Sequence, residues 1–292
     1  DWHGATWHGM PREQVAAALD RFAEVFGHYP VIATNHTGVE ESMYWGSDRM
    51  TGWRRFVYNL LTRFSHHHKH RGHIEGDEYF WGDLCKERIK YYRNFVFQDI
   101  NTLKACPLMP YHDPQKPYVN YWFASSNGAN VKTFNRCISE ANQDRLEAEG
   151  GVCIMYTHLA LGFSDGQALD RNFERLMRRL AKKNGWFVRA AVLLDYLLDA
   201  KGHCEITDSQ RRQLERKWLL EGQPLNFHRG VIGATGDPYG GALHEGHVAV
   251  VVDLLVLDRR EHEPLRIQPE LLTKHLIEQH VDLVQVPYAI HG

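Results

Sequence analysis

His3 and His8 are the first pair of side chains in the chain whose types and spacing suit metal chemistry. They flank a short loop of Gly, Ala, Thr and Trp just before a helical pattern. Two neutral imidazoles from one loop can bind Zn²⁺ or another divalent ion, and a third ligand must then come from elsewhere. The alternative is that both are loop histidines with ordinary hydrogen bonds, since an H-x4-H spacing without cysteine is a weak signal.

His158 is the best candidate for acid–base chemistry. It follows the apolar residues 151–157, so we expect it at the carboxyl end of a buried strand. Barrel enzymes carry their catalytic groups at that end, and an imidazole that titrates near neutral pH can protonate a leaving group. The alternative is that His158 only caps the turn at residues 159–162.

Polar side chains also follow other strand-like segments. The strand-like segment at residues 30–35 presents Asn35 and His36 at its end, where they could make polar contacts with a substrate. Asp99 ends a similar segment and is a ligand, a base or a turn-former, whereas Asn101 is expected to form a turn.

These residues must be positioned by alternating helices and strands in residues 1–219. Helical patterns cover residues 11–26, 170–183 and 191–198, the first with Pro11 in its first turn and Gly27 after its end. Short apolar runs predict buried parallel strands at residues 30–35, 94–99, 118–124, 152–157 and 186–188. This alternation predicts an α/β barrel or a layered sheet.

Residues 40–93 interrupt the alternation, and we interpret them as an insertion over the mouth of the barrel. Aromatic side chains of the insertion and rim could stack on sugar rings, or could simply pack in the core or a lid: Trp45, Trp53, Trp81 and Trp122. A cluster of histidines could bind metal adventitiously, although a solvated basic loop is the better interpretation: His66, His67, His68, His70 and His73.

The composition excludes several classes of protein. The chain has 292 residues, of which 43% are hydrophobic and 24% charged, with a formal charge of −2, as in an ordinary globular protein. The sequence predicts no membrane-spanning segment, because no apolar run reaches the roughly 18 to 20 residues that a bilayer requires. The charge balance gives no field that would gather nucleic acid. Five cysteines without a C-x-x-C pair predict reduced thiols and hence the cytoplasm.

The order of these motifs resembles the polysaccharide deacetylase (NodB homology) family of carbohydrate esterases. HGATWH is followed by a helix and by GHYPVIATNHTG, and much later by GGVCIMYTH, a helix and GWFVRAAVLLDYL. The resemblance covers residues 1–38 and 150–198. It implies a deformed (β/α) barrel, a divalent metal of which zinc is the first choice, and an N-acetylated sugar or glycan precursor as substrate.

The resemblance also implies roles for individual residues. His3 and His8 match the paired metal ligands of the family, and residues 155–158 match its late motif, in which His158 is the general acid. The spacing of the first pair departs from the H-x3-H of the family, and Met155 stands where the family has Leu. The acidic motif that supplies the base and a further ligand is expected upstream of Asp1.

Two other functions remain open. One is a catalytically degenerate barrel that binds glycan or a partner protein. The other concerns residues 220–292, a compositionally distinct C-terminal segment of uncertain nature, in which the H-x-G-H of His244 and His247 resembles the phosphate-contacting signature of the nucleotidyltransferase superfamily. The β-branched run that follows it favours a strand rather than the helix such a motif opens.

Overall fold

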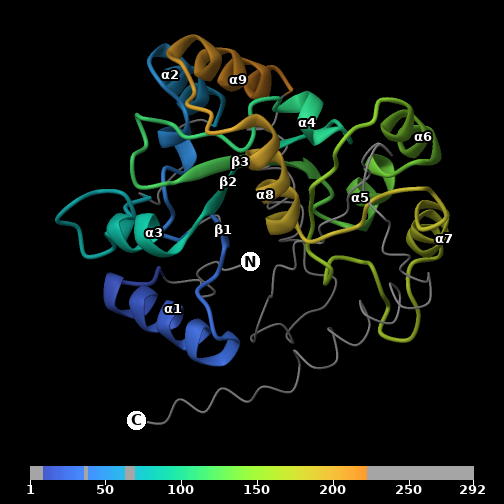
Figure 1. Ribbon diagram of the computed structural model, residues 1–292, viewed down its shortest axis with the longest axis horizontal. Coiled ribbons are helices and arrows are strands. Elements are labelled where there is room, and N and C mark those ends of the chain that lie inside the picture. Colours follow the sequence, from blue (N-terminus) through green and yellow to red (C-terminus); the bar gives the residue numbers. More distant parts are fainter. Residues whose placement is uncertain (1–8, 36–38, 63–69, 222–292) are drawn as a thin grey trace.

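A computed structural model describes residues 9–35, 39–62 and 70–221 of the chain. Its centre is a curled sheet of four parallel strands in the order β1-β2-β3-β4, with helices between consecutive strands (Figure 1). Parallel strands need crossover connections, and the sequential order means that each crossover leads to the adjacent strand. The protein is therefore an α/β fold in which the strands form a half-barrel.

The strands are short and lie close to the predicted positions. They are β1 (Ile32–Thr34), β2 (Tyr91–Phe97), β3 (Tyr121–Asn127) and β4 (Met155–Tyr156). The pairing of β2 with β3 shifts register between Arg93 and Val96, which marks an irregularity in the middle of the sheet. Because β2 begins at Tyr91, the segment predicted as an insertion at residues 40–93 overlaps the first three residues of this strand.

The helices confirm the three predicted helical patterns. Helix α1 (Arg12–Phe26) ends at Gly27, whose φ of 76° is left-handed and suits glycine. Helix α7 (Arg171–Leu180) begins after Asp170, whose side chain accepts a hydrogen bond from the Phe173 amide, and α8 spans Ala190–Lys201. The remaining helical elements are η1 (Gly46–Arg49), α2 (Trp53–Leu61), α3 (Gly82–Arg88), α4 (Thr102–Ala105), α5 (Val131–Cys137), α6 (Glu140–Ala148) and α9 (Asp208–Leu220).

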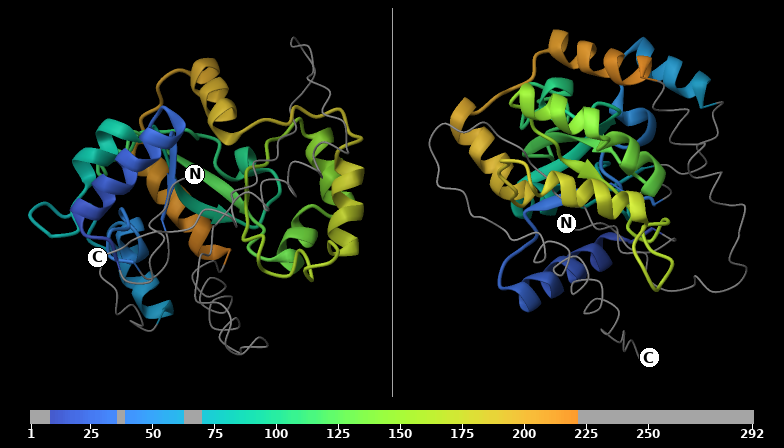
Figure 2. Two further views of the ribbon diagram at one scale, coloured as in Figure 1. Left: turned by 90° about the horizontal axis from the view of Figure 1, so that it is seen from below. Right: turned by 90° about the vertical axis from the view of Figure 1, so that its right-hand side faces the viewer.

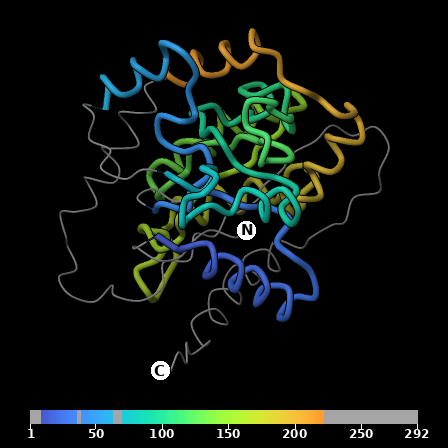
Figure 3. The backbone as a smooth tube through the Cα atoms, turned by 90° about the vertical axis from the view of Figure 1, so that its left-hand side faces the viewer, coloured from blue at the N-terminus to red at the C-terminus, as the bar shows by residue number. Residues whose placement is uncertain are grey.

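Two groups of helices flank the sheet. Helices α5, α6 and α7 stand together at one end of the molecule (Figures 1 and 2). Helices α2 and α9 are far apart in the sequence but lie side by side at the opposite side of the fold (Figures 1 and 3). The segment that was predicted as an insertion thus packs on the last described helix.

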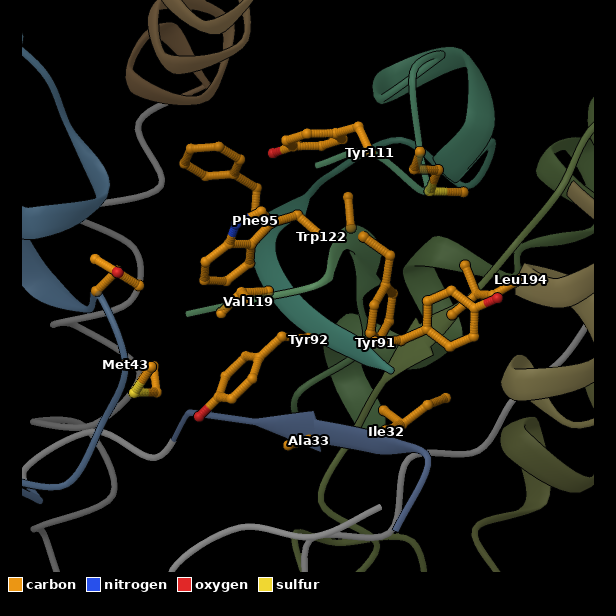
Figure 4. Packing of buried hydrophobic residues seen from close by; sticks show 14 of the residues in the cluster. Ile32, Ala33, Met43, Tyr91, Tyr92, Phe95, Tyr111, Val119, Trp122 and Leu194 are labelled. Atoms are coloured by element: carbon orange, nitrogen blue, oxygen red, sulfur yellow. The ribbon is translucent and has the colours of Figure 1, made fainter. Parts of the chain in front are cut away.

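The larger hydrophobic cluster is formed by both faces of β2 with the helices and loops around them. Tyr91, Tyr92 and Trp122 are almost fully buried there, with Ile32 and Leu194 next to Tyr91 (Figure 4). A second cluster lies under α5 and α7, where the rings of Phe134, Phe163 and Phe173 meet edge to face with centroids 5.0 to 5.3 Å apart.

The predicted strand at residues 186–188 is wrong, because these residues make no strand pairing in the structure. Trp186 and Val188 instead pack as partly buried side chains against the larger cluster, while Phe187 packs against the second cluster. Their apolar character therefore reflects side-chain contacts in a connecting segment, which has the same composition as a short strand.

Two sequence predictions concern membrane-spanning segments and the cellular compartment of the protein. No helix in the described part of the chain combines the length and apolar character that crossing a bilayer would require. All five cysteines are free, and four of them are buried. The cytoplasmic location remains a prediction.

Helix α9 supplies one partner of each of two buried ion pairs. The Arg54 Nε donates to Glu215 at 2.5 Å, and Thr51 donates to the same carboxylate through its amide and its hydroxyl. Arg211, one turn earlier on α9, lies 2.7 Å from Asp113, and both are at least 94% buried as side chains. A buried ion that loses its partner is costly, so these contacts hold α9 against distant parts of the chain.

We expect Glu215→Gln to lower the free energy of unfolding by about 3 kcal/mol, because Arg54 would stay buried without a counter-charge. The matched control is Glu174→Gln, which breaks an exposed i,i+4 pair with Arg178 and should cost at most about 1 kcal/mol. Urea unfolding of both variants checks the difference. Equal midpoints for the two variants would contradict the structural role of the Glu215 pair.

Candidate functional site

The candidate site lies at the carboxyl end of β4, where His158 follows Tyr156 and Thr157. The strands are parallel, so the carboxyl ends of β1, β2, β3 and β4 lie at one edge of the sheet. Backbone bonds from Ser126 to Ile154 and from Gly128 to the Tyr156 carbonyl keep β4 against β3. His158 therefore emerges at the edge where a barrel carries its reactive groups.

Two contacts with described residues orient the ring of His158. Its Nδ1 lies 3.2 Å from the Ala129 carbonyl, and the Tyr156 hydroxyl lies 3.1 Å from its Nε2. A carbonyl oxygen only accepts, so Nδ1 carries a proton and the neutral ring accepts the Tyr156 hydroxyl at Nε2. Burial raises the pKa of Tyr156, which keeps this hydroxyl protonated as a donor.

Two buried arginines lie near Tyr156. The Arg93 guanidinium of β2 is 4.3 Å from the centre of the Tyr156 ring. Arg49, at the end of η1, packs on Trp45 at 3.2 Å and faces Trp218 of α9 at 4.9 Å, both distances from its central carbon to the ring centre. Burial lowers the pKa of Arg49 to about 9, with Tyr58 opposing this shift and the nearby charge of Arg93 adding to it.

These arginines were missed by the sequence reasoning. Arg93 did carry a signal, since it interrupts a run of aromatic and apolar residues that forms a buried strand. Arginine is rarely buried without a partner or a function. Arg49 carried no such signal, because it lies in the short segment GSDR whose composition is typical of an exposed turn.

Asn35 follows β1 at the same edge, but its side chain serves the fold. Its Oδ1 accepts from the Met43 amide at 2.7 Å and from the Tyr92 hydroxyl at 2.9 Å, while its Nδ2 donates to the Met43 carbonyl. Figure 4 shows the Tyr92 hydroxyl pointing to this end of β1. Asn35 and His158 share the carboxyl edge but belong to the two outer strands, and no contact joins them among the described residues.

Trp122 lies in the core rather than on the rim. Its side chain is fully buried, with the Tyr92 ring 5.5 Å and the Tyr44 ring 6.1 Å from its own ring. Trp45 and Trp81 are also buried, whereas Trp53 on α2 is 65% exposed. Of the four tryptophans considered for sugar stacking, three thus follow the packing alternative.

The interpretation of the histidine cluster as a solvated loop is wrong for His70 and His73. His70 is buried, with Nδ1 3.1 Å from the Val39 carbonyl. His73 accepts a hydrogen bond from the Tyr44 amide at Nδ1, and its ring packs 4.2 Å from the Tyr44 ring. Tyr44 has a φ of 47°, which is strained for a side chain of this size, so His73 helps to hold the turn before Arg49.

The polar residues after β2 form a turn. The Asp99 carboxylate accepts from the Asn101 amide at 2.9 Å and from Arg145 at 2.8 Å. Asn101 caps α4 by accepting from the Lys104 amide at 3.1 Å, which confirms its predicted turn role. These contacts are those of a turn and a helix cap, and they indicate no metal or acid–base role for Asp99 or Asn101.

The other predicted site residues lie outside the described part of the chain: His3, His8, His36, His66, His67, His68, His244 and His247. Within residues 9–35, 39–62 and 70–221, no group of three or more His, Cys, Asp and Glu side chains is arranged to hold a metal ion. The described residues therefore do not by themselves form a metal centre.

Comparisons of the chain with protein-family models, curated proteins and solved structures find no match.

The contact between His73 and Tyr44 predicts a pH dependence of stability. Burial lowers the pKa of His73, opposed by Asp48, with Lys116 and Arg55 adding to the lowering. The unfolded chain then binds more protons than the folded one below the ordinary histidine pKa. The contribution of His73 is therefore full above about pH 6.5 and is lost as the pH falls through that value towards the lower folded pKa.

We expect His73→Asn to lose less stability than the unaltered protein between pH 7 and 5. The amide oxygen of the Asn can still accept the Tyr44 N–H but does not titrate. Urea unfolding at several pH values measures the effect, with replacement of the exposed His28 by Asn as the control. An unchanged pH dependence in His73→Asn would contradict the assignment.

Proposed function

We propose that the chain is a metal-dependent deacetylase-like hydrolase that acts on an N-acetylated sugar or glycan precursor. The half-barrel would be part of a deformed (β/α) barrel of the polysaccharide deacetylase type. The sequential order of four parallel strands supports this proposal, since a barrel of alternating strands and helices is built in that order. The motifs HGATWH and MYTH carry the resemblance on which the choice of reaction rests.

The observation that carries the proposal is the position of His158 at the carboxyl end of β4, with Nδ1 directed at the Ala129 carbonyl. This bond orients the ring and leaves Nε2 as the nitrogen that exchanges a proton. The Tyr156 hydroxyl occupies Nε2 in this structure, so a leaving group must replace it as the partner of Nε2 during turnover.

His158 then acts as the general acid. Hydrolysis of the acetamide adds water across the carbon–nitrogen bond and releases acetate and an amine. The imidazolium of His158 donates its Nε2 proton to the departing nitrogen as that bond breaks. The Ala129 carbonyl stabilises the protonated ring through Nδ1–H, and Tyr156 stays neutral beside it.

The metal in this proposal is a divalent ion, with zinc as the first choice and His3 and His8 as two of its ligands. Both histidines lie outside the described residues. A divalent ion bound there would polarise the acetamide carbonyl and activate the attacking water.

A catalytically degenerate barrel that binds glycan or protein is the second candidate. The observation that favours it is Asn35, whose predicted substrate contact is replaced by bonds to Met43 and Tyr92. The nucleotidyltransferase-like role of His244 and His247 in the C-terminal segment stays a separate prediction. It would require binding of a nucleoside triphosphate that depends on both histidines.

We expect His158→Gln to lower turnover of an N-acetylated oligosaccharide by roughly 10² to 10⁴, because a positioned general acid is lost. Gln can still contact the Ala129 carbonyl and the Tyr156 hydroxyl, so the midpoint of thermal unfolding should change little. Released acetate measures turnover. The matched control is Tyr156→Phe, which removes the hydroxyl contact to Nε2 but keeps the imidazole of His158. Full activity of His158→Gln would refute the assignment and favour the binding module.

We expect His3→Ala and His8→Ala each to remove most of the metal affinity of the full-length protein, because each takes away one of few protein ligands. Metal analysis after dialysis against a weak chelator gives the stoichiometry. Replacement of the exposed His203 by Ala is the control. Stoichiometric metal retained in both variants, or no metal in the unaltered protein, would count against the metal-dependent mechanism.

A further inference from the structure

The outer face of helix α2 carries apolar side chains that the described residues leave exposed. Trp53, Phe56 and Leu60 are 65%, 62% and 57% exposed. They are spaced at i, i+3 and i+7, so they form one ridge, the α2 ridge, while Arg54 and Tyr58 on the opposite face are buried. Single exposed apolar side chains are common, but three on one helix face indicate a surface that docks on something else.

Helix α9 extends this surface. Arg54 pairs with Glu215, and the Tyr58 ring stacks 6.1 Å from the Trp218 ring, so α2 and α9 lie side by side and run in the same direction. Figures 1 and 3 show both helices at the same edge of the fold. Leu220, the last residue of α9, is 75% exposed and lies at the end of the pair where α2 also ends.

Positive charge accompanies the apolar side chains. Arg212 and Arg216 are exposed and lie four and eight residues before Leu220, so all three form one stripe on α9. Neither arginine makes an ion pair with a described residue. Asp208 binds Arg211 and reaches Arg212 only through longer-range electrostatics. The stripe therefore leaves net positive charge on the helix beside α2.

The sequence that follows α2 is also basic. Residues 63–69 read RFSHHHK, which carries two permanent positive charges and no acidic residue. They lie outside the described part of the chain, but they follow Thr62, the C-cap of α2, directly. Arg55 adds little to this charge, because it pairs with Asp48.

We propose that the α2 ridge, with Arg212 and Arg216 of α9, is a docking surface for the anionic headgroup face of a phospholipid bilayer. A helix with Trp, Phe and Leu on one face and basic residues nearby lies in the plane of a membrane interface. Its apolar side chains enter the acyl boundary while arginines contact lipid phosphates. The amphipathic ring of Trp53 suits this depth.

The charge favours lipid over another copy of the chain. A second copy docked ridge to ridge would bring surfaces of the same positive sign together, and like charges across an interface are costly. An anionic bilayer complements both the apolar and the basic side chains. The inference describes a protein that lies on a membrane surface, and it does not depend on the proposed reaction.

The first test measures flotation of the full chain with unilamellar vesicles in about 0.1 M sodium chloride. Vesicles of phosphatidylcholine alone are compared with vesicles in which about a third of the lipid is phosphatidylglycerol. We expect binding to the anionic vesicles that weakens as salt is raised, because exposed charges are screened. No binding to these vesicles, or equal binding to phosphatidylcholine alone, would overturn the proposal.

Replacing Trp53 and Phe56 together by Gln tests the α2 ridge. Each lost aromatic ring should weaken vesicle binding about tenfold or more, because its apolar area no longer leaves water. The matched control replaces Val25 and Phe26 by Gln, two side chains of α1 that are 57% and 61% exposed and far from α9 (Figure 1). Both double variants should keep the thermal midpoint. An equal loss of binding in the two, or none in either, would refute the ridge.

Replacing Arg212 and Arg216 together by Gln tests the charge. Each arginine near an anionic surface contributes roughly fivefold in affinity, so the double variant should bind roughly twentyfold more weakly and depend less on salt. Arg178→Gln is the control, because this exposed arginine of α7 pairs with Glu174. Undiminished binding without Arg212 and Arg216 would contradict the assignment.

Trp53→Phe identifies the side chain that enters the bilayer. Brominated acyl chains quench a nearby tryptophan, so the fluorescence of the unaltered protein should fall on binding. Trp53→Phe should still bind but lose this quenching, and quenching that persists would show that another face docks. Sedimentation without vesicles tests the other occupant. A dimer that disappears when Trp53 and Phe56 are replaced by Gln would show that the ridge joins two copies, and would overturn the lipid proposal.

Discussion

Charges inside a protein are costly unless they are paired, and helix α9 meets this requirement for Arg54 and Asp113 through its own Glu215 and Arg211. Arg211, Glu215 and Trp218 are spaced at i, i+4 and i+7, so one face of the helix carries all three. Arg211 binds Asp113, Glu215 binds Arg54, and Trp218 stacks near Arg49. Helix α9 thereby holds α2, β2 and the loop that precedes β3 together.

Arg49 is a buried cation that α9 contacts by stacking and not by an ion pair. Its stack on Trp45 and Trp218 depends on α9, and the turn that precedes it depends on the contact between His73 and Tyr44. Arg49 lies close enough to Tyr156 for an electrostatic interaction, and the Tyr156 hydroxyl contacts His158. The same packing that stabilises the fold therefore brings positive charge close to the candidate site at the carboxyl end of β4.

Local chemistry was sufficient to predict several elements. Gly27 ends α1 because its left-handed backbone suits glycine, and Asp170 begins α7 because its carboxylate caps the first turn. The apolar run before His158 predicted a buried strand, and β4 lies there, although only Met155 and Tyr156 pair. Strand boundaries were less predictable. Residues 186–188 look like a strand, but they pack without pairing, because apolar composition does not specify a backbone partner.

The sequence by itself determined that the segments of α1, α7 and α8 are helical, that the strands are parallel and buried, and that His158 follows a strand. These properties depend on periodicity and on caps within a few residues. Only the tertiary structure decided that Trp122 is core, that Asn35 binds Met43, and that Arg49 is buried without a described counter-charge. Arg54 and Glu215 are 161 residues apart in the chain. Whether such a charge is paired, solvated or left for a ligand depends on contacts between distant residues, and no local pattern records them.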